Sequence, residues 1–325
     1  MTSRPSSPSV PTREPVNPVV DPRQQPALLD LAAARVVRKL ADAGVESILL
    51  KGPATRRNLY GGDDRAYADI DLLVAPAAWP AAVRTLAQLG FIGLDVRFAD
   101  GYHALAYRNT KGVSVDLHRR VPGTRADDAD GWTLLFDRSE AAVVGSGRAR
   151  IPDRATTFAI VTLHAAHDPK APKVLADLAR AVSVADRDLW REALDVADQL
   201  GAREAFSAGL RLHPGGARLC DELGLAPPTR ASVRLQADGS FHAAVLARAR
   251  EMSAGARLAA LLRMAFPTRD ELLTQPWTNS MAARRATLPL AFVVRWFYAG
   301  SRLAAAAGPY RRARRAERAS RRPSP

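Results

Sequence analysis

Two aspartates one residue apart, Asp69 and Asp71, carry the clearest chemical signal in the sequence. They lie in the segment ADIDLLV, residues 68–74, whose alternation is typical of a half-buried strand. Because side chains alternate faces along a strand, Asp69 and Asp71 point one way and Ile70, Leu72 and Val74 point the other. Two carboxylates this close repel each other and raise each other's pKa unless a cation lies between them. A divalent metal is the simplest such cation, and hard oxygen ligands suit Mg²⁺ or Mn²⁺.

A third carboxylate follows on a later segment with the same alternating pattern. In Val113–His118, apolar residues alternate with polar ones. Asp116 therefore lies on the polar face of a predicted strand, and His118 is its neighbour on that face. The segment His103–Tyr107 predicts a second strand, joined to the first around Lys111-Gly112.

The residues before the aspartates predict a strand, a tight turn and a short helix. Val45–Leu50 is an apolar run that suits a buried strand, and Lys51-Gly52 follow it directly. Pro53 is well placed as the first residue of a helix, and Gly61-Gly62 supply its stop. The acidic strand comes next, so a glycine turn and a pair of carboxylates are separated by one short helix.

The composition indicates a globular protein of one large domain or two ordinary ones. The chain has 325 residues and a hydrophobic content of 47%, which is ample for a buried core. Its single cysteine, Cys220, excludes an internal disulfide, fits a reducing compartment and is expected to be a small buried residue. No apolar segment of the signal-peptide type follows Met1, which argues against secretion and predicts a cytoplasmic protein. The sequence has no Walker loop, GxGxxG, HExxH, paired CxxC or GxSxG motif.

These residues together resemble the nucleotidyltransferase fold shared by enzymes related to DNA polymerase beta. The resemblance rests on Lys-Gly in LLKG, on ADIDLLV, on the lone aspartate of VDLHRR, and on Tyr60 and Arg65. The chain is similar to a bacterial group described only as uncharacterised nucleotidyltransferases. The likeness continues through Leu163–Val182 and Phe266-Pro267-Thr268, over roughly residues 30 to 300, which is the scale of whole domains. Lys51-Gly52 stands where the superfamily usually has Gly-Gly or Gly-Ser, so a point charge replaces a hydroxyl contact.

The resemblance implies an α/β (α+β) protein, with a polymerase beta-like nucleotidyltransferase fold built on a small mixed sheet and followed by an all-helical domain. We expect a disordered tail over residues 1–25, the nucleotidyltransferase domain over 26–125, a connecting segment over 126–150, a helical C-terminal domain over 151–307 and a basic tail over 308–325. Apolar spacing predicts the helices from Pro26, over Pro76–Gly90, Arg154–His167, Val174–Ala185, Leu189–Leu200, Glu204–Arg211 and Phe241–Leu262.

The resemblance also implies transfer of a nucleoside monophosphate from an NTP to a hydroxyl or phosphate acceptor, with release of pyrophosphate. Asp69 and Asp71 would bridge two divalent ions, Mg²⁺ or Mn²⁺. Asp116 would hold the catalytic ion and take the proton from the acceptor hydroxyl.

Four further residues would bind the nucleotide by the same resemblance. The backbone at Gly52 and the start of the following helix would cradle phosphate, because helix N-termini attract anions. Lys51 and Arg65 would stabilise the charge of the triphosphate. His118 would orient Asp116 or contact the substrate.

Each of these residues also has a purely structural explanation. Asp-x-Asp is common on exposed edge strands, Arg65 can pair with Asp63 or Asp64 on the surface, and His118 can be a buried structural histidine. Two other histidines, His164 and His167, lie one helical turn apart and can share an ion. No third ligand stands at a telling spacing, so we expect them to pack against the catalytic domain.

The net charge of +14 is unevenly distributed. Residues 301–325 contain eight arginines and one glutamate, which gives 8 − 1 = +7. A solvated helix end explains this charge, and contact with nucleic acid or an anionic membrane is the functional alternative. The apolar run Leu288–Ala307 is interrupted by Arg295 and Arg302, which argues against a membrane span.

The sequence leaves the acceptor open, with a small molecule, a sugar, a peptide, a protein and RNA as candidates, and it leaves the oligomeric state open. The alternative to an active transferase is a catalytically idle nucleotide-binding or scaffold protein of a gene cluster. Three intact aspartates argue against that alternative. A nucleic-acid-binding role for the tail lacks the interleaved aromatics that stack on bases.

Overall fold

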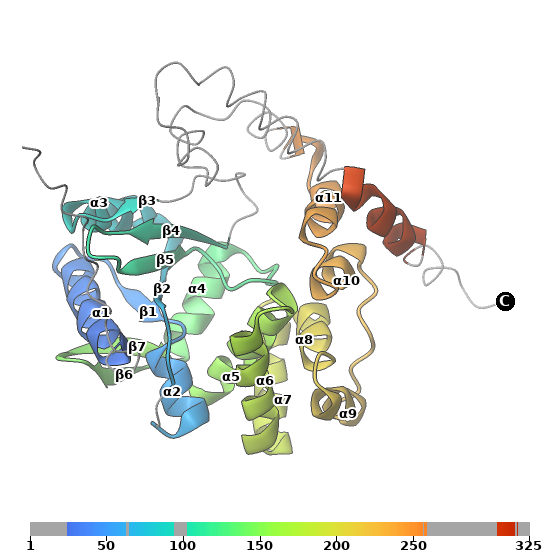
Figure 1. Cartoon of the computed structure of the whole chain (residues 1–325), viewed down its shortest axis with the longest axis horizontal. Helices are drawn as coiled ribbons and strands as arrows, with labels where there is room; N and C mark the ends of the chain where they lie inside the picture. Colours follow the sequence, from blue (N-terminus) through green and yellow to red (C-terminus); the bar gives the residue numbers. More distant parts are fainter. Residues whose placement is uncertain are drawn as a thin grey trace, which may run out of the picture.

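The apolar strand and the acidic strand lie side by side at the centre of a sheet (Figure 1). The structure is a computed structural model, and it describes residues 25–62, 65–93, 103–255, 257–258, 304–315 and 317. The apolar strand β1 (Ser47–Leu49) runs antiparallel to the acidic strand β2 (Asp69–Val74). The helix α2 (Pro53–Tyr60) lies between them in the chain, and Gly61 ends it with a left-handed backbone, as the sequence predicts.

The described residues contain one seven-stranded mixed sheet in the order β3-β4-β5-β2-β1-β7-β6. β2 is parallel to β5, β1 is parallel to β7, and the other neighbouring pairs are antiparallel. The remaining strands are β3 (Ile92–Gly93), β4 (Ala104–Arg108), β5 (Ser114–His118), β6 (Ser139–Val144) and β7 (Gly147–Pro152). The predicted α/β architecture with a mixed sheet is therefore confirmed.

The sheet is larger than expected because a hairpin adds two strands beside β1. β6 and β7 lie largely in the segment 126–150, which the sequence suggested as a connection, and Gly145 supplies the positive φ of their turn. The Gly-Ser-Gly turn, with an apolar run before it and alternating basic and apolar residues after it, is a hairpin signal in the sequence itself.

Helices cover both faces of the sheet and continue beyond it. The helices besides α2 are α1 (Gln25–Asp42), the 3₁₀ turn η1 (Pro76–Ala78), α3 (Trp79–Gln88), α4 (Asp128–Asp137), α5 (Arg154–His167), α6 (Pro172–Val184), α7 (Arg187–Gln199), α8 (Arg203–Leu210), α9 (Pro214–Glu222), α10 (Ala231–Ala237) and α11 (Phe241–Glu251). Residues 304–315 are also helical. The predicted helical half is confirmed, with α9 and α10 in addition to the helices expected.

The two faces of the sheet have different partners. On one face, apolar residues such as Leu72 and Val74 share a buried cluster with residues of α1 and α3. On the other face, Ile48 and Leu73 belong to the larger cluster built around the buried helix α5 and Trp190 of α7. Because side chains alternate along β2, its two aspartates share a face with Leu73. The carboxylates therefore face the helical half of the protein.

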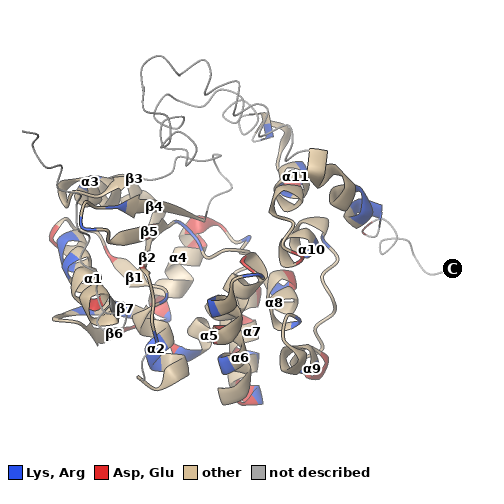
Figure 2. Cartoon of the chain, viewed as in Figure 1, with Lys and Arg blue, Asp and Glu red and all other residues tan. Residues whose placement is uncertain are grey.

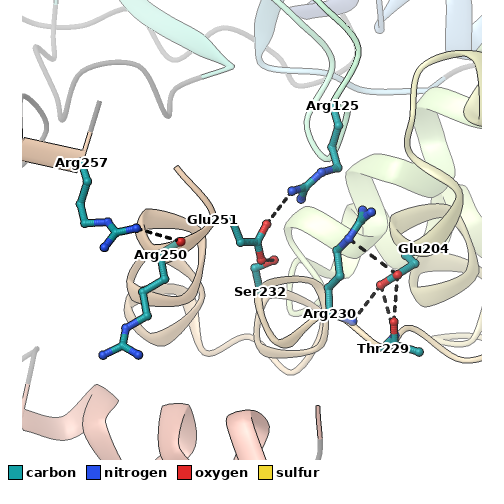
Figure 3. A network of polar contacts seen from close by, with 8 residues as sticks. All are labelled: Arg125, Glu204, Thr229, Arg230, Ser232, Arg250, Glu251 and Arg257. Carbon is teal, nitrogen blue, oxygen red and sulfur yellow. Dashed lines mark hydrogen bonds and ion pairs between the residues drawn. The ribbon is translucent and has the colours of Figure 1, made fainter. Parts of the chain in front are cut away.

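The pair α10–α11 is fixed to the rest of the chain by a network of polar contacts (Figure 3). Arg125, in the loop after β5, donates to Glu251 of α11 over 2.7 Å, and Ser232 of α10 donates to the same carboxylate over 2.6 Å. Glu204 of α8 accepts from the backbone nitrogens of Thr229 and Arg230, just before α10. The start of α10 and the end of α11 are therefore held together and tied to α8 and to the loop after β5.

The helix over residues 304–315 packs against α10 and α11. Ala306 is buried in a small cluster with Leu235, and Arg234 donates to the backbone oxygen of Ala313 over 2.7 Å. The first part of the expected basic tail is thus helical and in contact with the body, and in Figure 2 its arginines colour the C-terminal part of this helix blue. The predicted apolar run 288–307 lies mostly outside the described residues. Among the helices that are described, none has the length and apolar content to cross a membrane.

Candidate active site

The parallel pairing of β2 with β5 brings the three predicted aspartates together. Asp71 lies directly opposite Asp116, and Asp69 lies opposite Ser114 in the same register. All three aspartates line one cavity of about 610 Å³ between the sheet and the helical half. The alternation read from the sequence therefore places the carboxylates where a ligand can reach them.

Asp71 is the best-partnered of the three carboxylates. Its residue is only 4% exposed, and its Oδ1 lies 2.7 Å from Nζ of Lys51 and 2.9 Å from Nε2 of His118. Burial alone would raise the pKa of Asp71, but the Lys51 ammonium and the His118 contact hold it far below its usual range. The same attraction raises the pKa of Lys51 against the opposing effect of burial. Asp71 is thus an ionised carboxylate inside the protein.

The pKa values of Asp69 and Asp116 are shifted in the opposite direction from that of Asp71. Burial, and then repulsion from the charged Asp71, raise the pKa of each of them above its usual value. Lys51 and His118 offset only part of that repulsion. These two carboxylates are therefore short of positive charge, which a cation in the cavity would supply.

The donor set fits a divalent cation. Ligand atoms of Asp71, Asp116 and His118 lie within 4.8 Å of one another, and this is the only group of three or more His, Cys, Asp or Glu ligands among the described residues. The carboxylate oxygens of Asp71 and Asp116 are the hard ligands that suit Mg²⁺ or Mn²⁺. The predicted metal set was Asp69, Asp71 and Asp116, whereas this group contains His118 and does not include Asp69.

Gly52 forms the tight turn next to these carboxylates. Its φ of 60° is in the left-handed region that favours glycine, and a Cβ there would lie 3.0 Å from the ring of Tyr67. The ring is fixed in turn, because the Tyr67 hydroxyl donates to Asp30, which also pairs with Arg56 at 2.6 Å. No side chain caps the N-terminus of α2, so its first backbone N–H groups remain available to an anion.

Arg65 lines the cavity but is held by a residue that the sequence did not indicate. Its Nε donates to Oδ1 of Asp177 on α6 over 2.7 Å, and its Nη2 donates to the other carboxylate oxygen. Tyr60 donates to the same Oδ1 over 2.9 Å. The surface partners considered from the sequence, residues 63 and 64, lie outside the described residues.

The role of Asp177 depends on long-range packing, yet one local signal was present. Asp177 stands in the buried stripe of α6 with Val174, Leu178 and Ala181. A charged residue at an apolar position of an amphipathic helix predicts a buried partner, because burial of an unpaired charge is unfavourable. The identity of that partner, 112 residues away along the chain, follows only from the fold.

Histidines form a second wall of the cavity. His103, His118, His164 and His167 line it, which is four of the six histidines in the chain. The ring of His103 lies 5.5 Å from that of His118 and 4.5 Å from that of His167. Burial first, and then nearby positive groups including Lys51, lower the pKa of His103 and His164 well below the usual value and that of His167 to about 4. His164 and His167 thus pack against the catalytic half as uncharged rings, and neither belongs to the three-ligand group.

Comparison with known families gives the class of the protein, which is a nucleotidyltransferase enzyme. The chain belongs to the family described as "Uncharacterised nucleotidyltransferase", whose model matches residues 21–214. The matched range contains all the predicted site residues and ends in the helical half. The resemblance read from the sequence is therefore confirmed at the level of the family.

No curated protein matches the chain significantly. Among solved structures, one similar chain is the solution structure of the antibiotic-resistance factor ANT(2'')-Ia. The two share 15% sequence identity at a TM-score of 0.39, over 53% of this chain and 95% of that chain. Agreement at this level supports no conclusion about the acceptor.

The uncharged state of His167 predicts a pH dependence of stability. A pKa of about 4 in the folded state, against 6.5 for the free side chain, means that the unfolded chain binds the proton more tightly. Above pH 6.5 the neutral ring of His167 does not lower the free energy of unfolding. As the pH falls from 6.5 toward 4, protonation of the unfolded chain lowers the free energy of unfolding by up to about 1.4 kcal/mol per pH unit. Urea unfolding at pH 7 and pH 5 should show a smaller loss in His167→Gln than in the wild type. Equal losses, or an NMR titration of the ring near pH 6.5, would contradict this assignment.

Proposed function

We propose that the protein transfers a nucleoside monophosphate from an NTP to an acceptor, with release of pyrophosphate. The observation that carries the proposal is the register of β2 and β5, which sets Asp71 opposite Asp116 beside the Lys51-Gly52 turn. Nucleotidyl transfer needs this combination, because it requires carboxylates for cations and a backbone turn for phosphates in one cavity. The family supports the reaction in general and leaves the acceptor open.

Asp69, Asp71 and Asp116 are the proposed metal ligands, and His118 lies within reach of the same ion. When bound, Mg²⁺ or Mn²⁺ supplies Lewis-acid stabilisation of the attacking and leaving oxygens. His118 also has a positioning role, because its contact fixes the orientation of Asp71. The sequence suggested Asp116 as the partner of His118, whereas Asp71 is the carboxylate that it contacts.

The triphosphate is proposed to lie along the Gly52 turn and the open N-terminus of α2. Lys51 is already beside the carboxylates and can share its charge with a phosphate oxygen in the same cavity. Arg65 offers its Nη1, the nitrogen of its guanidinium group that is buried without a hydrogen-bond partner. Lys51, Gly52 and Arg65 would thus neutralise charge that increases on the leaving pyrophosphate.

Asp116 is proposed as the base that takes the proton of the acceptor. Its pKa is raised by burial and by Asp71, which makes its carboxylate a better proton acceptor than an exposed aspartate. It also lines the cavity together with residues of the helical wall, where an acceptor has room to bind. A small molecule, a peptide, a protein and RNA all remain candidates for that acceptor.

The first test is the binding of a non-hydrolysable ATP analogue with Mg²⁺, measured by calorimetry. Asp69→Asn should weaken binding at least about tenfold, or roughly 1.4 kcal/mol, because the metal–nucleotide complex loses a ligand. Asp71→Asn should weaken binding as well and also lower the thermal midpoint, since the ammonium of Lys51 loses its buried partner. Asp128→Asn removes an aspartate that pairs with Arg120 outside this cavity and serves as the control. Unchanged metal-dependent binding in both site variants would refute the assignment of the carboxylates.

A second test separates chemistry from binding at Asp116. Asp116→Asn should keep the affinity for the Mg²⁺–ATP analogue within about tenfold, because Asp69 and Asp71 remain. Turnover should fall far more, since general-base help is typically worth about 10²–10⁴-fold. Pyrophosphate release from ATP, slow with water as acceptor, is the readout before the true acceptor is known. Release at the wild-type rate would make Asp116 an ordinary strand residue, and tight binding without any release by the wild type would favour the idle nucleotide-binding alternative.

A further inference from the structure

The lysines of this chain are concentrated at the cavity. The sequence has five lysines among its 47 lysines and arginines, and three of the five, Lys51, Lys170 and Lys173, line this one cavity. Lys51 is paired with Asp71. In the part of the chain that the structure describes, Lys170 and Lys173 have no carboxylate within salt-bridge distance. Both side chains keep exposed surface, so they can reach a ligand.

Arg65 adds a buried donor that lacks a partner. The side chains of Arg65 and Asp177 are each 9% exposed. The Asp177 carboxylate accepts hydrogen bonds from Nε and Nη2 of Arg65. Nη1 remains buried without a hydrogen-bond partner. A buried donor without a partner destabilises the protein, and more so when it is charged, so an acceptor atom at this position would be favourable. Arg65 lines the cavity, and a ligand there can provide that acceptor.

The first turn of α6 lies in the same wall. Lys170, Ala171 and Lys173 surround its start and line the cavity, and no side chain caps its first N–H groups. Asp177 lies one turn after Lys173 on the same helix, so α6 presents both the cation and the residue that holds Arg65. Burial, and then the positive charge of Arg65, lower the pKa of Lys173 against the attraction of Asp69 and Asp177. An anion between Arg65 and Lys173 would relieve the repulsion between these two cations.

Asp69 and Asp177 attract Lys173, but neither forms a salt bridge with it. Asp177 is engaged by Arg65 and Tyr60, and Asp168, which also lines the cavity, is exposed. The backbone of Gly239, in the α10–α11 turn, leaves room for the side chain of Lys170, because a Cβ there would overlap it. Near this turn, the side chain of Gln236 in α10 donates to the backbone oxygen of His167 at the end of α5 over 2.5 Å, which holds the turn beside the cavity.

We propose that Arg65, Lys170, Lys173 and the first turn of α6 form a phosphoryl-group subsite on the helical wall of the cavity. Asp177 is its positioning residue, since it turns Arg65 so that Nη1 alone is free. The ligand is a terminal phosphate, either of the NTP or of a phosphorylated acceptor. The inference rests on the proposed function in treating the cavity as the transfer site, but the subsite itself needs no metal.

The test is calorimetric binding of tripolyphosphate to the full chain in EDTA. Lys173→Gln should weaken binding at least about fivefold, because it removes one of the cations and its side chain is not part of the core. Asp177→Asn should weaken it several-fold by releasing Arg65, and Asp177→Glu should restore part of the loss. Lys111→Gln, an exposed lysine in the turn after β4, and Asp128→Asn are the matched controls and should bind as the wild type does.

The same variants distinguish the two sources of phosphate. If Lys173→Gln weakens the Mg²⁺–ATP analogue to the same degree, the subsite takes the triphosphate of the nucleotide. If it keeps that affinity but loses binding of inorganic phosphate to the protein saturated with the analogue, the subsite takes a phosphate of the acceptor. Tripolyphosphate affinities of Lys173→Gln and Asp177→Asn within twofold of the wild type would overturn the inference. Failure of the metal test on Asp69 would leave it standing, because binding is measured without metal.

Discussion

The candidate site depends on one buried ion pair, between Lys51 and Asp71. A carboxylate that is 4% exposed stays ionised only with a close cation, and the ammonium 2.7 Å away is that cation. The charge kept on Asp71 then raises the pKa of Asp69 and Asp116. The pair therefore sets the electrostatics of the whole carboxylate group. The pair also links the Lys51-Gly52 turn to the acidic strand β2, so a substitution in one of these segments alters the charge balance of the other.

The second constraint is that the helical half must pack on the acidic face of the sheet and still leave a cavity in front of the aspartates. Ile48 and Leu73 complete the core against α5 at one part of that face. The aspartates occupy another part, where the helical half leaves a cavity of about 610 Å³. Arg65 and Asp177 bridge the two halves at its edge. The helical half is thus a wall of the site as well as a support for the sheet.

Local patterns in the sequence predicted the strands that carry the aspartates well, because alternation decides which side chains share a face. Asp69 and Asp71 on one face, apolar residues on the other, and Asp116 on a later strand all followed from a period of two. What could not be predicted was which distant side chains meet. His118 contacts Asp71 and not its strand neighbour Asp116, and Arg65 finds Asp177 on α6. Such partners are chosen by strand order and helix packing, which no local pattern encodes.

The central claim is that these carboxylates bind a divalent ion together with a nucleotide. The most direct measurement is a crystal structure with Mn²⁺ and a non-hydrolysable ATP analogue, with anomalous scattering to locate the metal. The account predicts an anomalous peak in contact with Asp71 and Asp116, and phosphate oxygens against the backbone of Gly52. A nucleotide bound elsewhere, or a cavity in which Lys51 still neutralises Asp71 and no Mn²⁺ touches either carboxylate, would contradict it.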